Sequence, residues 1–238
     1  LHLHTQYSLL DGFSKIENLM DKVKELGMDS VAITDHGVMF GVVDFYKKAK
    51  KKGINPIIGC EVYVSFRSRH DRENIDKKSY HLILLAENNE GYQNLIKIVS
   101  AGFVEGFYYK PRVDYEILKK YSKGIIALSA CLAGEIPQRL MEGKYPEAKL
   151  AAERLSELFG RDNFYLELQD HDIPEQARVN MYIQKLSRET GIPMVATNDV
   201  HYLTKEDWKT HEILMCIQTG KTLQDEHRME FKTNEFYL

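Results

Sequence analysis

The sequence has few of the features that mark secreted, membrane-spanning or freestanding DNA-binding proteins. Its three cysteines (Cys60, Cys131 and Cys216) are too few for a disulfide framework and are typical of a reducing, cytoplasmic compartment. It contains no apolar run of membrane-spanning length and no visible signal peptide, so no membrane partner is expected. The net charge of −3 excludes a strong positive field that would attract DNA unaided. A nuclease that receives DNA from a neighbouring domain stays compatible with this charge.

Internal repeats, low-complexity tracts and Pro- or Gly-rich linkers are also missing, so we expect a single domain over residues 1–238. Hydrophobic residues make up 43% of the chain and charged residues 28%, which is typical of a globular protein. The chain has no initiator Met and begins inside an expected strand. We therefore expect it to be part of a longer protein, with residues 219–238 leading into the part that follows.

Short apolar strands alternate with amphipathic helices along the sequence. The strands are expected at residues 1–4, 30–34, 54–64, 81–86, 125–129, 164–168 and 194–197. Ser14 and Glu17 predict a capping box at the start of the first helix. The short spacing indicates parallel strands with right-handed crossovers. Seven such strands predict an α/β fold, a distorted seven-stranded, TIM-like β/α barrel that is closed or nearly closed.

Candidate metal ligands gather at the expected strand ends, where β/α barrels hold their chemistry. His2 and His4 alternate with leucines, so both imidazoles are expected on one side of the first strand. The remaining candidates are Asp11, His36, Glu61, His81, Cys131, Asp199 and His201. His81 is the exception, because it lies near the start of its strand. Mixed imidazole, carboxylate and thiolate ligands favour Zn²⁺, with Mn²⁺ or Fe²⁺ at oxygen-rich positions.

Nine ligands exceed the needs of one tetrahedral ion, so a cluster with bridging carboxylates is expected. Such a cluster suits phosphoester hydrolysis, because one ion ionises the attacking water while others neutralise phosphate oxygens and the leaving group.

Each candidate also has a plainer explanation when it is taken alone. His81 and Cys131 fit ordinary buried positions, Asp11 belongs to a common turn dipeptide, and Asp199 fits a helix cap. Glu61 is the hardest to explain in this way, because a carboxylate among apolar strand residues needs a buried partner. Their joint placement at one barrel mouth favours the metal site.

Four motifs match the PHP (polymerase and histidinol phosphatase) superfamily. They are His2-Leu3-His4, Thr34-Asp35-His36-Gly37, Gly59-Cys60-Glu61 and Asn198-Asp199-Val200-His201. The stretches at residues 4–12, 56–64, 109–112 and 129–132 resemble the N-terminal PHP domain of bacterial DNA polymerase III alpha subunits. No exonuclease domain interrupts the motifs, which is similar to the DnaE type. The resemblance spans essentially the whole chain.

The resemblance implies a distorted seven-stranded β/α barrel with three divalent metal ions. His2, His4, Glu61 and Asp199 would hold the first ion, and Glu61 would bridge to a second ion held by His81 and Cys131. Asp11, His36 and His201 would hold the third. The implied activity is metal-dependent 3′–5′ exonuclease proofreading, with Glu61, Asp199 and His201 at the reacting centre. The implied partners are DNA at the primer 3′ end, the remaining polymerase domains that follow residues 219–238, and other replisome subunits.

Residues around the ligand set are candidates for substrate contacts. Lys110 and Arg112 are expected to bind phosphate, and Tyr108 or Tyr109 to stack on a base. A loop that only packs on the barrel rim is the alternative for these residues. His171 follows the sixth strand and is a candidate general acid or phosphate contact.

The remaining polar candidates are assigned positional roles. We expect Asp35 to orient a ligating imidazole instead of binding metal itself. His70, His211 and His227 lie in polar or helical contexts and are expected on the surface.

Two other functions fit the same ligand set. One is a metal-bound scaffold without turnover, which stabilises the polymerase and docks a separate proofreading exonuclease. The other is a small-molecule phosphatase of the histidinol-phosphate type, against which the polymerase-like stretches outside the metal motifs count. An intact ligand set permits turnover without proving it, so the exonuclease and scaffold hypotheses both stay open at this stage.

Overall fold

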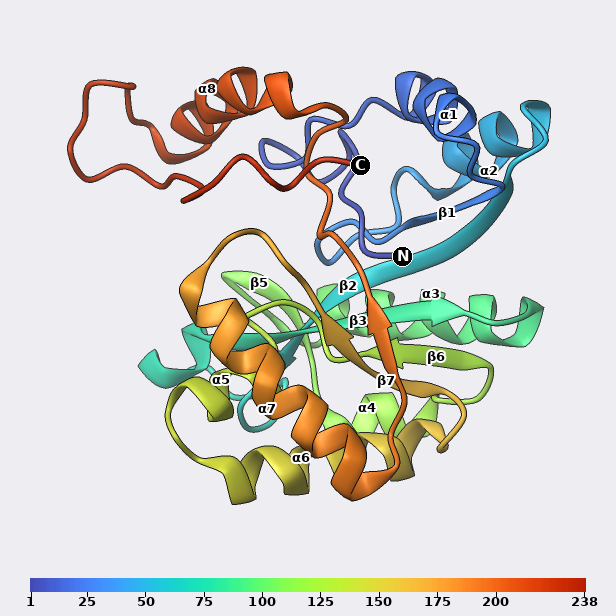
Figure 1. The fold of residues 1–238 in the computed structure, drawn as a ribbon. Helices are drawn as coiled ribbons and strands as arrows, with labels where there is room; N and C mark the ends of the chain where they lie inside the picture. The colour runs from blue at the N-terminus through green and yellow to red at the C-terminus, as the bar shows by residue number, and fades with distance from the viewer.

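One strongly curved sheet organises the computed structural model, which describes residues 1–238 (Figure 1). The strand order is β4-β5-β2-β3-β6-β7-β8, and β1 pairs with β2 outside this path. The strands are β1 Ser30–Ile33, β2 Asn55–Ser65, β3 Ser79–Ala86, β4 Phe107–Tyr108, β5 Lys110–Val113, β6 Ile125–Leu128, β7 Phe164–Leu168 and β8 Met194–Ala196. The predicted α/β, barrel-like fold class is confirmed, although the curled sheet forms a half-barrel and is not closed by strand pairing.

Helices cover the sheet along its length. They are α1 Ile16–Glu25, α2 Val42–Lys51, α3 Asn89–Val104, α4 Tyr115–Lys120, α5 Glu135–Met141, α6 Tyr145–Phe159, α7 Pro174–Thr190 and α8 Trp208–Thr219, with short 3₁₀ turns η1 Asn74–Lys77 and η2 Lys205–Asp207. In Figure 1, α1, α2 and α8 lie above the strands, whereas α4 to α7 lie below them. None of the helices combines the length and apolar content needed to cross a membrane.

Two main apolar clusters fix the sheet and the segments that carry the candidate ligands. The larger packs β2, β3, β6 and β7 against α3 to α7. The second lies under α1 and α2 and contains Leu3 and Val200, which are 2% and 4% exposed. Leu3 lies between His2 and His4, and Val200 lies between Asp199 and His201. Burying them anchors both segments and directs the neighbouring polar side chains the other way.

Strand β3 differs from the prediction of uniformly parallel strands. It pairs antiparallel with both β2 and β6, whereas β1/β2, β2/β5, β6/β7 and β7/β8 are parallel. The register places His81, near the start of β3, opposite Tyr63, near the end of β2. The reversed direction therefore explains the apparent exception, because the beginning of β3 lies at the same rim as the carboxyl ends of its neighbours.

The first predicted strand, residues 1–4, forms an isolated parallel bridge from Leu3 to Val200. The His4 N–H donates to the Val200 carbonyl (2.8 Å), and the Val200 N–H donates to the His2 carbonyl (3.0 Å). On its other side, the Thr34 N–H donates to the Leu3 carbonyl (2.9 Å). This segment thus links the end of β1 to the loop after β8 and closes the rim that strand pairing leaves open.

Two local predictions are corrected by the structure. Helix α1 begins without a side-chain cap from Ser14, and the Ile16 N–H donates instead to the Gln6 side-chain carbonyl (2.8 Å). The aromatic stretch predicted as a loop forms the tight hairpin β4–β5, with Tyr109 at a positive φ of 62° in its turn.

Candidate metal centre

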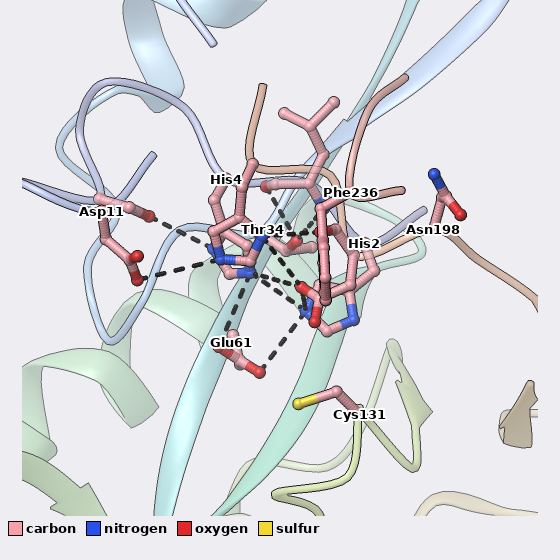
Figure 2. A network of polar contacts seen from close by, with 12 residues as sticks. His2, His4, Asp11, Thr34, Glu61, Cys131, Asn198 and Phe236 are labelled. Atoms are coloured by element: carbon pink, nitrogen blue, oxygen red, sulfur yellow. Dashed lines mark hydrogen bonds and ion pairs between the residues drawn. The ribbon is translucent and has the colours of Figure 1, made fainter. Parts of the chain in front are cut away.

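The structure brings all nine sequence-predicted ligands to the rim of the half-barrel. They come from residues 1–4, the loop before α1, the end of β1, β2, the start of β3, and the loops after β6 and β8. The side chains are His2, His4, Asp11, His36, Glu61, His81, Cys131, Asp199 and His201. Figure 2 shows His2, His4, Asp11 and Glu61 converging, with the Cys131 sulfur at the edge of the group.

The first group of donors surrounds Asp199. Its Oδ1 lies 3.0 Å from Nε2 of His2 and 3.2 Å from Nε2 of His4. The two Nε2 atoms are 3.1 Å apart, and His2 Nε2 lies 3.5 Å from Oε1 of Glu61. These atoms face one another at distances that a single ion between them would span.

Glu61 connects this first group to a second one. Its carboxylate is fully buried, and its Oε1 lies 2.8 Å from Nδ1 of His81. The Cys131 sulfur lies 4.0 Å from the same His81 nitrogen. The other oxygen, Oε2, contacts Nδ1 of His36. Glu61 therefore occupies a bridging position among three sets of donors.

The third group forms around Asp11. Its Oδ2 lies 2.7 Å from Nε2 of His36 and 3.9 Å from Nε2 of His201. The rings of His4 and His36 are stacked with centroids 3.9 Å apart, and His201 lies 4.6 Å from His4. His4 therefore contacts the third group as well as the first.

The chemistry of this cluster fits divalent cations. Glu61 Oε2 and His36 Nδ1 are buried and contact each other, and neither atom has a further hydrogen-bond partner. A cation that displaces the proton between them would accept the lone pairs of both atoms. Imidazole nitrogens, carboxylate oxygens and one sulfur form a donor set that suits Zn²⁺.

Neighbouring charges outweigh burial for the acidic groups and for two histidines. Burial acts to raise the pKa of Glu61, but His81 and His36 hold it well below its usual range. Burial likewise opposes ionisation of Asp199, and His2 and His201 lower its pKa. Burial alone would lower the pKa of His36, but Glu61 and Asp11 raise it to about 10.

The two histidines of the first motif, His2 and His4, have pKa values that are shifted in opposite directions. Burial disfavours the charged form of His2, yet Asp199 and Glu167 raise its pKa well above the usual value. Burial and the nearby His36 and His201 lower the pKa of His4 to about 3. The ion-free cluster thus holds protons on His2 and His36 as counter-charges to its carboxylates.

A pocket of about 970 Å³ opens over the cluster and is lined by seven of the nine candidates, while His2 and His4 lie beneath it. Lys110 and Tyr109 also line it. The Lys110 ammonium lies 4.2 Å from the Tyr63 ring, and burial lowers the pKa of Lys110. Tyr109 is 66% exposed at the pocket mouth. Both residues are placed where a substrate could reach them.

Arg112 does not face this pocket, contrary to the prediction. Its side chain is fully buried and donates to the backbone carbonyls of Gly106, Asp76, Arg69 and Asp71 at 2.8–3.1 Å. The guanidinium therefore has no exposed donor for a phosphate. It ties the connection between β2 and β3, including η1, to the turn before β4 instead.

The predicted role of His171 as a general acid or phosphate contact is also wrong, because its ring has no free nitrogen. Nδ1 accepts from the Gln176 amide (2.8 Å), and Nε2 donates to the Asn198 carbonyl (2.8 Å). The ring is fully buried and stacks on Phe236, with centroids 3.9 Å apart. His171 supports the loop that carries Asp199.

Asp35 contacts no imidazole directly. It accepts hydrogen bonds from the Thr5 backbone, the Thr5 hydroxyl and the Ser8 hydroxyl at 2.6–2.8 Å. The Ser8 oxygen then lies 3.3 Å from Nδ1 of His4. Asp35 thus acts on His4 only through Ser8, which is more indirect than the predicted role.

Of the three histidines expected on the surface, His211 is only 1% exposed. Its Nε2 donates to the Asp11 backbone carbonyl (2.7 Å), and its ring stacks on Phe231. Helix α8 therefore packs onto the ligand loop before α1. His70 and His227 are exposed, as predicted.

Sequence reasoning missed Glu167 in β7. Its side chain is 2% exposed, and Oε1 lies 2.7 Å from Nδ1 of His2. The signal that singled out Glu61 also applies here, because Glu167 stands between Leu166 and Leu168 in a predicted strand.

Known proteins resemble this chain in sequence and in fold. A family model described as "PHP domain" matches residues 1–171. The whole chain is 48% identical over 240 residues to DNA polymerase III subunit alpha of Borreliella burgdorferi, of which it covers 21%. It is 48% identical over 246 residues to the corresponding subunit of Thermus aquaticus, of which it covers 20%. The chain therefore spans about a fifth of the length of these relatives.

A solved structure from Bifidobacterium adolescentis, assigned as a metal-dependent phosphoesterase, matches with a TM-score of 0.50 at 15% identity. The match covers 84% of this chain and 86% of that protein, and it shows the same fold. The resemblance to the PHP domains of DNA polymerase III alpha subunits is thus confirmed by both the family model and full-chain identity. This chain belongs to the PHP domain family.

Proposed function

We propose that this chain is the PHP domain of a cytoplasmic DNA polymerase III alpha subunit and that it removes mismatched nucleotides from primer 3′ ends. Residues 1–238 would form one domain, with residues 219–238 leading into the polymerase part. The nine rim ligands would hold three divalent ions, Zn²⁺ in preference to Mn²⁺ or Fe²⁺. The remaining alpha subunit and other replisome subunits would be its partners.

One observation carries the proposal: three adjoining donor groups share Glu61 beneath an open pocket. When bound, the ions supply the positive charge that ionises an attacking water and neutralises phosphate oxygens. Seven ligands line the pocket, so a phosphodiester that enters it would lie directly against the cluster. The relatives that match over the whole chain are polymerase subunits, which favours DNA over a small phosphate ester.

The pocket residues would position the DNA. Lys110 stands at the rim with its ammonium over the Tyr63 ring and within the electrostatic reach of Glu61 and Asp11, where a phosphate would find a positive partner. Tyr109, in the β4–β5 turn, presents an exposed ring on which a terminal base would stack. Asp199 and His201 would hold the reacting phosphate through the ions they bind, and Glu61 would link the ion at Asp199 to the one held by His81 and Cys131.

The test is metal-dependent nucleotide release from a 3′-mismatched primer by the full-length protein and its Asp199→Asn variant. The amide keeps the shape but removes the charge shared by His2 and His4. We expect release to fall by at least about a hundredfold, because a ligand of the reacting centre is weakened.

The matched control is Asp162→Asn, which makes the same chemical change at an exposed position before β7, away from the rim. It should retain wild-type release. If the wild-type protein releases nothing with Zn²⁺, Mn²⁺ or Mg²⁺ while it remains folded and metal-loaded, the exonuclease proposal is wrong.

The scaffold function is favoured by a different observation. The ligands come from segments far apart in the chain, including residues 1–4 and the loop after β8, which meet only at the rim. Bound ions would therefore cross-link these distant segments and reinforce the closed rim. A silent nuclease whose melting temperature falls on metal removal would support this second function.

A further inference from the structure

The carboxyl end of β7 carries polar side chains that the metal centre itself does not use. Glu167 lies in β7, and Gln169 and His171 follow just after the strand. Hydrogen bonds link Glu167 to Gln169 and, through Gln176, Gln169 to His171. Glu167, Gln169 and His171 are buried, at 2%, 5% and 0% exposure. Buried polar residues at a strand end need partners, and these partners identify their role.

Glu167 directs one carboxylate oxygen at the back of His2. Oε1 accepts from His2 Nδ1 (2.7 Å), from the Gln169 amide (2.8 Å) and from the Thr197 hydroxyl. The acceptor fixes a proton on Nδ1, so the other ring nitrogen of His2 is the one available to an ion. That nitrogen, Nε2, faces Asp199 and His4 at 3.0 and 3.1 Å.

A second chain of hydrogen bonds leads from Gln169 to the backbone beside Asp199. The Gln176 amide contacts both the Gln169 side-chain oxygen (3.3 Å) and Nδ1 of His171 (2.8 Å). His171 then donates from Nε2 to the Asn198 carbonyl (2.8 Å). The next residue, Asp199, has a positive φ of 44°, a conformation that non-glycine residues rarely adopt unless they are held.

We infer that Glu167 is a positioning residue for the metal centre, orienting His2, and that His171 fixes the backbone from which Asp199 projects. Strand β7 and the segment that follows it would thus hold two ligands of one ion from behind without binding the ion themselves. This inference rests on the metal centre of the proposed function, but it does not depend on whether that centre hydrolyses DNA. Carboxylate partners of this kind raise the basicity of a ligating imidazole and hold its orientation.

The test compares the full chain with Glu167→Gln by chelator competition with Zn²⁺ and by the visible absorption spectrum of the Co²⁺-loaded protein. The amide can still accept a hydrogen bond, but it loses the charge that polarises His2. We expect one ion to bind about 10- to 100-fold more weakly, with a changed Co²⁺ spectrum and unchanged circular dichroism.

Asp114→Asn is the matched control. Asp114 is also a buried carboxylate, at 5% exposure, but it pairs with Arg69 and caps α4. The Asp114→Asn substitution should lower the melting temperature and leave Zn²⁺ affinity and the Co²⁺ spectrum unchanged.

A second variant, Thr197→Val, removes one hydrogen bond to Glu167 and keeps the carboxylate, so it tests the role even if Glu167→Gln fails to fold. It should weaken the same ion about fivefold, the value of one net hydrogen bond. Wild-type affinity and spectrum in folded Glu167→Gln, or in Thr197→Val if that is the variant that folds, would overturn the inference. A wild-type chain that binds no divalent ion would overturn the metal centre as well.

Discussion

At single residues of the rim cluster, protons and metal cations compete for the same ligand atoms. Protons on His2 and His36 balance the carboxylates of Glu61 and Asp199 in the ion-free protein. Burial, together with Asp199 and Glu61, raises the pKa of the Cys131 thiol well above its usual value. All three protonated groups must lose a proton at the ligating atom before they bind an ion.

Metal binding should therefore release protons and strengthen as pH rises. The His36 pKa of about 10 means that this ring is protonated at pH 7 and that an ion must displace the proton. We expect apparent Zn²⁺ affinity to increase from pH 6 to pH 9, with at least two protons released at pH 7. Calorimetry in buffers of different ionisation enthalpy measures this number.

Cys131→Ser provides the control, because a hydroxyl ligand keeps its proton and the release should fall by about one. In the ion-free chain, by contrast, the free energy of unfolding should fall as pH rises. A raised His36 pKa contributes stability that is present below about pH 6.5 and is lost as pH rises toward 10. Affinity that does not change with pH would contradict this description of the cluster.

At the scale of elements, strand β5 carries two positively charged side chains, Lys110 and Arg112, in different environments. Lys110 opens onto the pocket, whereas Arg112, two residues on, lies buried among backbone carbonyls of the β2–β3 connection and of the turn before β4. Both side chains are positive and both belong to one short strand. The hairpin thus combines a pocket-lining residue with a structural anchor.

Arg112→Lys should lower the free energy of unfolding by about 3 kcal/mol, because an ammonium cannot replace the planar fork and leaves buried carbonyls unsatisfied. Urea unfolding measures this loss, and Zn²⁺ content should be unchanged. Lys110→Met, the paired variant, should change unfolding by less than about 0.5 kcal/mol and raise the KM for primer. Equal effects of the two variants on stability would show that the assigned roles are wrong.

Sequence patterns predicted the elements better than their directions. Six of the seven expected strands formed, because apolar runs and turn residues mark them locally. The reversed β3 was not predictable in this way, since a strand buried on both faces reads alike in either direction. The position of His81 became clear only from pairing with β2. The role of Arg112 was hidden for a similar reason, because its acceptors are backbone atoms up to 43 residues away.

The convergence of the nine candidate side chains was accessible to sequence analysis. Each candidate is a chemically competent donor at or near a strand end, and the family motifs select them from other histidines. His171 and His211 were misassigned because their burial depends on Phe236 and Phe231 from the last residues of the chain. Local polarity carries no information about such distant packing.

In the whole molecule, both ends of the chain meet at the candidate metal centre. Residues 1–4 bridge the end of β1 and the loop after β8. Near the other end, the Asn198 amide donates to the backbone carbonyls of Glu235 (3.0 Å) and Tyr237. Figure 1 shows the final segment and α8 above the strands, on the same side as α1. The rim is therefore held by contacts between distant parts of the sequence.

The central claim is that these nine side chains form one site for three ions. Anomalous diffraction at the zinc edge, on crystals grown with Zn²⁺, tests it most directly. We predict three adjacent peaks: one by His2, His4 and Asp199, one by His81 and Cys131, and one by Asp11, His36 and His201, with Glu61 reaching the first two. No zinc peak at the rim, or a single ion bound without Glu61, would contradict the claim.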